Sequence, residues 1–399
     1  MAELNHFSTP VRVLLDRARG TFAVDILRAA SVRINGRLQA AKLLTGPLII
    51  QKLDEYSLEM IRIPFAPLVA QDFILQWAEP DVGFQIAERR YRGSLRLRMA
   101  AGEAIAINTL PMQEYLASTV GGEMSPSWPL EALKAQSVAA RSYTVARLRK
   151  PRDRYFDLED TTEDQVYRGV ETETLSVWDA VKGTSGIVLT RKGAPVTAYY
   201  HARCGGETLP AEQAWGGKRA PTARVPCAFC RKNPMQWDAQ WDAKSFASTL
   251  GLPARGDLSI RPVSRNPAGR VLELEVAAGN QRRLITAERL RREIGYQKIK
   301  STHFDFTVDG QEVRATGFGF GHGVGMCQWG AKHLAQRGYN FQAILTHYYP
   351  REKAVRWTPP QISLDSPRFA GIGSLHDRPA ALRLPFARRA DRALSSRTP

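Results

Sequence analysis

Hydrophobic and polar residues alternate along much of the first hundred positions, as they do in β-strands that bury only one face. The alternation is clearest in five segments: 11–15, 31–35, 59–63, 94–99 and 104–108. The last two flank Ala101-Gly102, a dipeptide typical of a hairpin turn. We therefore predict a β-rich N-terminal part over residues 1–90, followed by a further hairpin.

Residues 129–149 follow the helical period instead. Within this predicted helix, Lys134, Val138, Arg141 and Val145 recur every three or four positions and so share one face. Two cations in a half-apolar stripe either lie along the edge of the core, as long basic side chains often do, or face an anionic group.

Glu123 stands just before that helix, after Gly121 and Gly122. The two glycines are expected to end a short helical run, which would place Glu123 on a turn between two helices. A carboxylate at such a break is the best candidate in this chain for a general acid or base.

The second half of the chain mixes short elements of both kinds. We expect strands at 186–190, 195–199 and 270–276 and helices at 244–250 and 287–294. Because strands and helices alternate irregularly, the predicted fold class is α+β. Residues 358–399 are rich in Pro, Ser and Arg without periodicity and are predicted to form a basic disordered tail.

The charge balance points to an anionic partner. The 399 residues carry a formal net charge of +17 and are 43% hydrophobic, which is ordinary for a globular enzyme apart from the charge. No nucleic acid is expected, because the chain lacks a helix-turn-helix spacing, an RNP strand motif and a two-Cys two-His finger.

No apolar run is long enough for a transmembrane segment, and the first residues lack the basic and apolar regions of a signal peptide.

Three of the four cysteines occur in two short motifs, His201-Ala-Arg-Cys204 and Cys227-Ala-Phe-Cys230. Two close ligand pairs of this kind suit a tetrahedral structural Zn²⁺ site with four protein ligands. A disulfide in an oxidising compartment and a redox pair remain alternatives. Cys327 is expected to be a small buried residue.

His322 lies in a glycine-rich run, Gly317-Phe-Gly-Phe-Gly-His322-Gly-Val-Gly-Met-Cys327-Gln-Trp-Gly-Ala331. The glycines would let the backbone approach a sugar closely, or the ring could brace tight turns by hydrogen bonds to the main chain. The run fits neither the dinucleotide fingerprint nor a Walker A loop.

Two long motifs, in the order in which they occur, resemble the signatures of the SpoIID/LytB family of stage II sporulation protein D relatives. The first runs from Leu110 to Tyr143 and the second is the glycine-rich run with its continuation to Pro350. The resemblance extends from about Val11 to Pro350. It implies a catalytic core over residues 91–357, with the Cys/His segment near 201–230 as an insert that departs from the commoner family pattern, which has Ser at the position of Cys204.

The resemblance also implies an activity, that of a lytic transglycosylase acting on peptidoglycan glycan strands, with peptide-stripped strands as the expected substrate. In stripped strands each muramic acid exposes its lactyl carboxylate, which suits the basic charge of this chain. Glu123 would protonate the bond between N-acetylmuramic acid and N-acetylglucosamine and then deprotonate the C6 hydroxyl, giving a 1,6-anhydro product. Burial would have to raise its pKa. The candidate substrate-binding residues are Lys134, Arg141, Tyr143 and His322.

Other functions stay open at this point. Some family members are described as non-catalytic enhancers of a cell-wall amidase, which would make the amidase a partner. A zinc-braced nucleic-acid binder would use the same charge and the same Cys/His motifs. Family members act outside the cytoplasmic membrane, so an extracytoplasmic location is expected from the resemblance alone.

Overall fold

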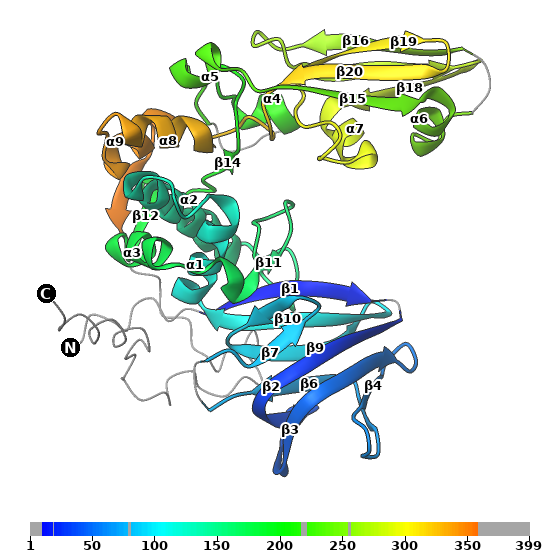
Figure 1. Ribbon diagram of the computed structural model, residues 1–399, viewed down its shortest axis with the longest axis vertical. Coiled ribbons are helices and arrows are strands. Elements are labelled where there is room, and N and C mark those ends of the chain that lie inside the picture. The colour runs from blue at the N-terminus through cyan, green and yellow to red at the C-terminus, as the bar shows by residue number, and fades with distance from the viewer. Residues whose placement is uncertain (1–9, 19, 79–80, 217–221, 254–256, 358–399) are drawn as a thin grey trace, which may run out of the picture.

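The computed structural model describes residues 10–18, 20–78, 81–216, 222–253 and 257–357. From one end to the other it consists of a large twisted sheet, a group of helices and a second β-rich body (Figure 1). The fold is α+β, as predicted. Among these residues no helix is long and apolar enough to cross a membrane. The predicted tail at 358–399 lies outside the described residues.

The large sheet has 11 strands and contains the whole predicted N-terminal part. Its path is β11-β1-β10-β9-β6-β2-β3-β4-β5, with β7 paired to β2 and β8. The bounds are β1 (Pro10–Ala18), β2 (Thr21–Ile34), β3 (Arg37–Lys52), β4 (Leu58–Ile61), β5 (Leu68–Ala70), β6 (Asp72–Gln76), β7 (Phe84–Ile86), β8 (Arg89–Tyr91), β9 (Ser94–Ala100), β10 (Glu103–Pro111) and β11 (Leu158–Glu159).

The predicted hairpin is confirmed as β9 and β10, with positive φ at Ala101 and Gly102 in the turn. Strand β10 also pairs along its length with β1. The sheet is therefore continuous across the boundary that we expected at residue 90.

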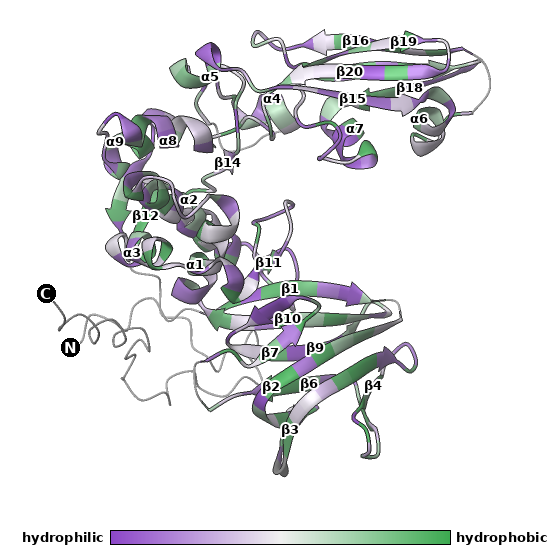
Figure 2. Cartoon of the chain, viewed as in Figure 1, coloured by the Kyte–Doolittle hydropathy of each residue, from purple (hydrophilic) through white to green (hydrophobic). Residues whose placement is uncertain are grey.

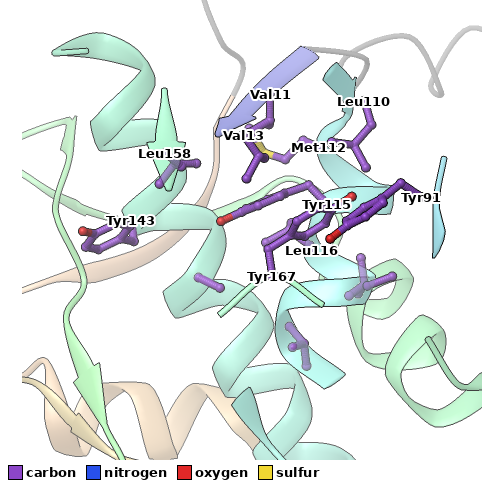
Figure 3. Close-up of a cluster of buried hydrophobic side chains, with 14 of the residues drawn as sticks. Val11, Val13, Tyr91, Leu110, Met112, Tyr115, Leu116, Tyr143, Leu158 and Tyr167 are labelled. Carbon is purple, nitrogen blue, oxygen red and sulfur yellow. The ribbon is translucent and has the colours of Figure 1, made fainter. Parts of the chain in front are cut away.

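Helix α1 (Met112–Glu123) follows directly from β10, and α2 (Leu130–Arg149) is the predicted long helix. Aromatic rings join the sheet to α1. The ring of Tyr167 lies 5.4 Å from that of Tyr115 and 5.8 Å from that of Tyr91, and Val11 and Leu110 lie in the same cluster (Figure 3). This core fixes the direction in which α1 leaves the sheet.

The remaining elements of the middle layer come from distant parts of the chain. They are η2 (Gly169–Thr172), α3 (Leu175–Gly183), β12 (Ile187–Arg191), β13 (Ala194–Pro195), β14 (Tyr200–His201), α4 (Ala211–Trp215), α5 (Ala228–Lys232), β21 (Met326–Cys327), α8 (Gln328–Gln336), α9 (Phe341–Tyr348) and β22 (Lys353–Arg356). Strands β14 and β21 pair in parallel, with Tyr200 opposite Met326 and His201 opposite Cys327. This pairing brings both sequence motifs to one place.

The second β-rich body has its own hydrophobic core, which runs from Trp237 to Ala315. It contains β15 (Gln236–Asp242), α6 (Ala243–Thr249), β16 (Leu258–Arg265), β17 (Val271–Ala278), β18 (Gln281–Thr286), α7 (Ala287–Ile294), β19 (Phe304–Asp309) and β20 (Glu312–Phe318). Hydrophilic and hydrophobic residues alternate along β20 (Figure 2), as half-buried strands require. The predicted strand at 270–276 and the helices at 244–250 and 287–294 are confirmed.

Two local predictions are wrong. Of the strand expected at 195–199, only Pro195 lies in a strand, β13. Gly121 and Gly122 do not end a helix but lie inside α1, which continues to Glu123. A Cβ at Gly121 would stand 2.0 Å from the carbonyl oxygen of Thr172, and one at Gly122 would stand 2.9 Å from that of Val166. The glycines are therefore needed for close packing of the segment 166–172 against α1.

Substituting Gly121→Ala is expected to destabilise the protein by about 1–3 kcal/mol, because a Cβ must push the backbone of Thr172 away. The gain in helix propensity from Gly to Ala, about 1 kcal/mol, offsets only part of this. Thermal unfolding measures the change. Gly20→Ala is the matched control, since a Cβ there meets no atom within 4 Å. Equal melting temperatures for the two variants would contradict the packing argument.

Candidate active site and cysteine cluster

Glu123 is the last residue of α1, and three separate segments hydrogen-bond to its half-buried side chain. The Val166 amide donates to Oε1 at 2.9 Å, and the Tyr200 hydroxyl donates to the same oxygen at 3.4 Å. Gln328 Nε2 donates to Oε2 at 3.3 Å. The carboxyl group is thus held where the end of α1, strand β14 and the start of α8 meet.

Gln165 controls how the Tyr200 hydroxyl is oriented. Its Oε1 accepts hydrogen bonds from the hydroxyls of Tyr115, at 3.0 Å, and Thr144, at 2.9 Å. Its Nε2 therefore faces Tyr200 and donates to that hydroxyl oxygen at 2.8 Å. Because the Tyr200 oxygen accepts this bond, its own hydrogen is available to Glu123.

Burial is the largest influence on Glu123 and raises its pKa, because the charged form loses hydration. The hydrogen bonds from Val166, Gln328 and Tyr200, and the charge of Arg168, act in the opposite direction without cancelling it. None of these four partners is a second carboxylate. The direction agrees with the requirement stated above for a general acid.

Arg141 does not lie where a substrate could reach it, which corrects the expectation that it faces the substrate. Its side chain is fully buried, and its guanidinium donates to the carbonyl oxygens of Thr184 at 2.8 Å, Val181 at 3.1 Å and Ile187 at 3.1 Å. Val181 lies in the last turn of α3 and Thr184 is its C-cap residue, and the C-terminal end of a helix favours a cation. Burial lowers the pKa of Arg141 to about 9. Arg141 therefore holds α3 against α2.

The other three candidate substrate-binding residues are also engaged within the protein. Lys134 is half-buried and pairs with Glu131 at 2.7 Å. Tyr143 is 4% exposed, and its hydroxyl donates to Asp164 at 2.7 Å. His322 Nδ1 accepts a hydrogen bond from the Val324 amide at 3.0 Å, so its ring braces the glycine-rich turn.

Four buried cysteines form a second cluster, hereafter the cysteine cluster: Cys204, Cys227, Cys230 and Cys327. Their sulfur atoms all lie within 4.8 Å of one another, and none is in a disulfide. His201, which the spacing placed in this set, lies outside it. Its Nδ1 is 3.1 Å from the Val324 carbonyl oxygen, and burial lowers its pKa to about 3.

Cys327 occupies the fourth place because β21 pairs with β14 and carries it next to the H-x-x-C motif. The arrangement fits a metal ion by the chemistry of its donors. Four thiolates around a tetrahedral Zn²⁺ stand about 3.8 Å apart when each metal–sulfur bond is about 2.3 Å. The Cys230 and Cys327 sulfurs are 3.5 Å apart, and backbone amides donate to the sulfurs of Cys204 and Cys327.

Sequence reasoning missed Val166, Tyr200 and Gln328 as partners of Glu123. Gln328 was inside the glycine-rich motif, directly after Cys327, and that position was the only signal that could have drawn attention to it. Tyr200 directly precedes the His201-Ala-Arg-Cys204 motif, and that position was its only signal. Val166 bonds through its backbone amide, which no side-chain pattern in the sequence reveals.

Two family models match parts of the chain. A family model described as stage II sporulation protein matches residues 100–191, and a model for a domain of unknown function matches residues 243–325. An uncharacterized protein of Brachyspira hyodysenteriae is 32% identical over 275 residues, which is 68% of this chain and 74% of that protein.

Two relatives in Bacillus subtilis carry functional names. Stage II sporulation protein D is 28% identical over 270 residues, or 61% of this chain and 74% of its own length. The protein named amidase enhancer is 27% identical over 290 residues, or 59% of this chain and 39% of its own length. With its family model, these relatives and both sequence motifs in place, the chain belongs to the SpoIID/LytB family of cell-wall-related proteins.

Proposed function

We propose that this protein is a peptidoglycan lytic transglycosylase and that Glu123 is its single acid and base. The observation that carries the proposal is a half-buried carboxyl group with a raised pKa, held by three neutral donors and without a second carboxylate among its partners. A hydrolase generally needs two carboxylates across the scissile bond. A transglycosylase needs only one, because the sugar supplies the attacking hydroxyl.

The two oxygens of Glu123 differ in a way that suits proton transfer. Oε1 accepts two hydrogen bonds, one of them a short bond from a backbone amide, whereas Oε2 accepts only the bond from Gln328. When Glu123 is protonated, we therefore place the proton on Oε2, which accepts fewer hydrogen bonds than Oε1.

In the first step Glu123 gives this proton to the glycosidic oxygen between N-acetylmuramic acid and N-acetylglucosamine. The C1–O bond breaks, and its electron pair stays on the departing N-acetylglucosamine oxygen. In the second step the muramic C6 hydroxyl oxygen bonds to C1 while the Glu123 carboxylate takes its proton. The 1,6-anhydro ring is closed, no water is consumed, and Glu123 is protonated again.

Other parts of the proposal follow from the same family. We take residues 91–357 as the catalytic core and the cysteine cluster as a closed structural Zn²⁺ site, in which the metal would link α5 and α8 without touching substrate. We also propose an extracytoplasmic location, because the substrate is there. Peptide-stripped strands are the preferred substrate, in line with the net charge of +17.

A second candidate function rests on the relative named amidase enhancer. A non-catalytic enhancer would bind glycan strands and a cell-wall amidase without cleaving anything. Incubating the protein with purified peptide-free glycan, followed by mass spectrometry, separates the candidates. Products with anhydromuramic ends support the transglycosylase. Products whose reducing ends have gained water indicate a hydrolase, and strands that stay intact support the enhancer function.

The raised pKa gives a pH prediction. Cleavage needs the protonated acid, so the rate is expected to fall as the pH rises through the pKa of Glu123. Gln328 stabilises the carboxylate and lowers this pKa. Gln328→Met should therefore move the alkaline limb of kcat/KM to higher pH. A shift to lower pH would contradict the assignment of this limb to Glu123.

A further inference from the structure

Next to the proposed catalytic group lies a set of aromatic and basic side chains that the mechanism above does not use. The rings of Trp128 and Trp329 meet edge to face with centroids 5.2 Å apart. The ring of Phe229 is parallel to that of Trp329, at 6.3 Å. All three residues are half-buried, so part of each ring remains open to solvent.

Two cations lie over these rings. Lys332 Nζ is 5.0 Å from the ring centroid of Trp128 and 4.7 Å from that of Trp329. The guanidinium carbon of Arg203 is 4.5 Å from the ring centroid of Trp329. Within the described part of the chain no ion pair joins either cation to a carboxylate, and Arg203 Nε is buried without a hydrogen-bond partner. We call these five residues the aromatic-basic platform: Trp128, Arg203, Phe229, Trp329 and Lys332.

The platform is continuous with the candidate site. Trp329 directly follows Gln328, which donates to Glu123, and the Trp329 amide donates to the Ala202 carbonyl at 3.2 Å. Arg203 comes three residues after Tyr200, the other side-chain donor to Glu123. Trp128 lies in the loop between Glu123 and α2. The segments that hold the carboxyl group therefore also carry the platform.

The cysteine cluster lies in the same segments as the platform. Phe229 lies between Cys227 and Cys230, and Cys204 directly follows Arg203. A Cβ at Gly330 would stand 2.8 Å from the Cys227 sulfur, so α8 packs directly on this thiol. The segments that carry the platform are therefore joined at one buried cluster.

We propose that the aromatic-basic platform is a saccharide subsite that recognises an acidic sugar and so selects peptide-free muramic acid. The proposal rests on the glycan function proposed above and adds which residues recognise the glycan. An apolar pyranose face would pack on those parts of the Trp128 and Trp329 indoles that Lys332 and Arg203 leave uncovered, because indoles offer large rigid surfaces. The free lactyl carboxylate would pair with Lys332 and Arg203 through charge-assisted hydrogen bonds.

An attached peptide turns the lactyl carboxyl group into a neutral amide. The two cations would then be covered by ligand without receiving a negative charge, which costs binding energy. Selectivity for stripped strands would thus reside in this surface, apart from the chemistry at Glu123.

Binding measurements test this. Isothermal titration of the full chain carrying Glu123→Gln, which prevents turnover, compares a peptide-free tetrasaccharide of alternating N-acetylglucosamine and N-acetylmuramic acid with chitotetraose, which has no carboxylate. We expect Lys332→Gln and Arg203→Gln each to weaken binding of the acidic tetrasaccharide by roughly 10-fold and to leave chitotetraose unchanged. Lys182→Gln is the matched control, since Lys182 lies over the Trp178 ring on α3, outside the platform.

The indole is tested separately. Trp329→Ala should weaken both ligands by roughly 10-fold, and Trp329→Phe should restore most of the loss. Unchanged binding in Trp329→Ala, or an equal loss of both ligands in the two cation variants, would overturn the proposal. The wild-type protein could bind the acidic glycan and yet form no anhydro product. That result would support the platform as a binding site and contradict the proposed lytic transglycosylase function.

Discussion

Replacing Glu123 by Gln is expected to lower the rate of glycan-strand cleavage by roughly 10²–10⁴-fold, the contribution typical of a general acid and base. The amide has nearly the same shape and can still accept the hydrogen bond from Val166, but it cannot give a proton to a glycosidic oxygen. Chromatography of anhydromuramic products from peptide-free strands measures the rate. Circular dichroism and thermal unfolding show whether the variant is folded.

The stability of this variant has an expected sign. Because burial raises the pKa of Glu123, the folded state favours the protonated acid, and some stability is lost as the pH rises through that raised pKa. A neutral amide avoids this loss. Glu123→Gln should therefore melt no lower than the wild type at alkaline pH, while its difference from the wild type shrinks toward acidic pH.

A matched control is Glu312→Gln, which removes an exposed carboxylate paired with Arg314 in the second β-rich body. It should leave cleavage unchanged. If a folded Glu123→Gln variant cleaved strands as fast as the control, Glu123 would have no acid or base role, and the enhancer function would become the better account.

The sequence located α2 correctly because the signal for this helix is local. The helical period of residues 130–149 needs no information from elsewhere in the chain. The partners of Glu123 are another matter. Val166, Tyr200 and Gln328 lie 43, 77 and 205 residues away along the chain, so only the folded structure brings them together.

Arg141 shows the limit of periodicity in another way. The helical period places it correctly on a face with Val138, but it does not say what covers that face. In the structure the C-terminal end of α3 covers that face, and its carbonyl oxygens accept hydrogen bonds from both terminal nitrogens of the guanidinium. Likewise, the sequence alone suggests that Gly121 ends a helix. In the structure the Thr172 carbonyl lies so close to Gly121 that no side chain fits there.

The metal ligands were predicted from spacing, which finds pairs but cannot find a single residue supplied by a distant strand. Cys327 is 97 residues from Cys230, and its place in the cluster depends on the pairing of β14 with β21. His201 satisfies the H-x-x-C spacing, but its Nδ1 faces a backbone carbonyl. Its ring lies 5.5 Å from that of His322, on the glycine-rich turn.

Removing Cys327 should therefore remove the metal, whereas removing His201 should not. We expect the wild-type protein to hold about one Zn²⁺ per chain and Cys327→Ser to hold far less, because a closed structural site needs all four ligands. Since metal binding contributes directly to folding, the melting temperature of Cys327→Ser should fall by roughly 10 °C. His201→Ala should keep its zinc, with a smaller loss of stability from the cavity it leaves.

Elemental analysis by mass spectrometry gives the zinc content, and substitution with Co²⁺ reports the ligands through the intensity of thiolate-to-metal absorption. Loss of metal in His201→Ala with retention in Cys327→Ser would restore the ligand set expected from spacing. Titration of free thiols in the denatured protein tests the remaining alternative, a disulfide between two of the cysteines. All four sulfurs lie close enough to bind one metal ion, so we expect four free thiols per chain. Two free thiols per chain would show that a disulfide has formed instead.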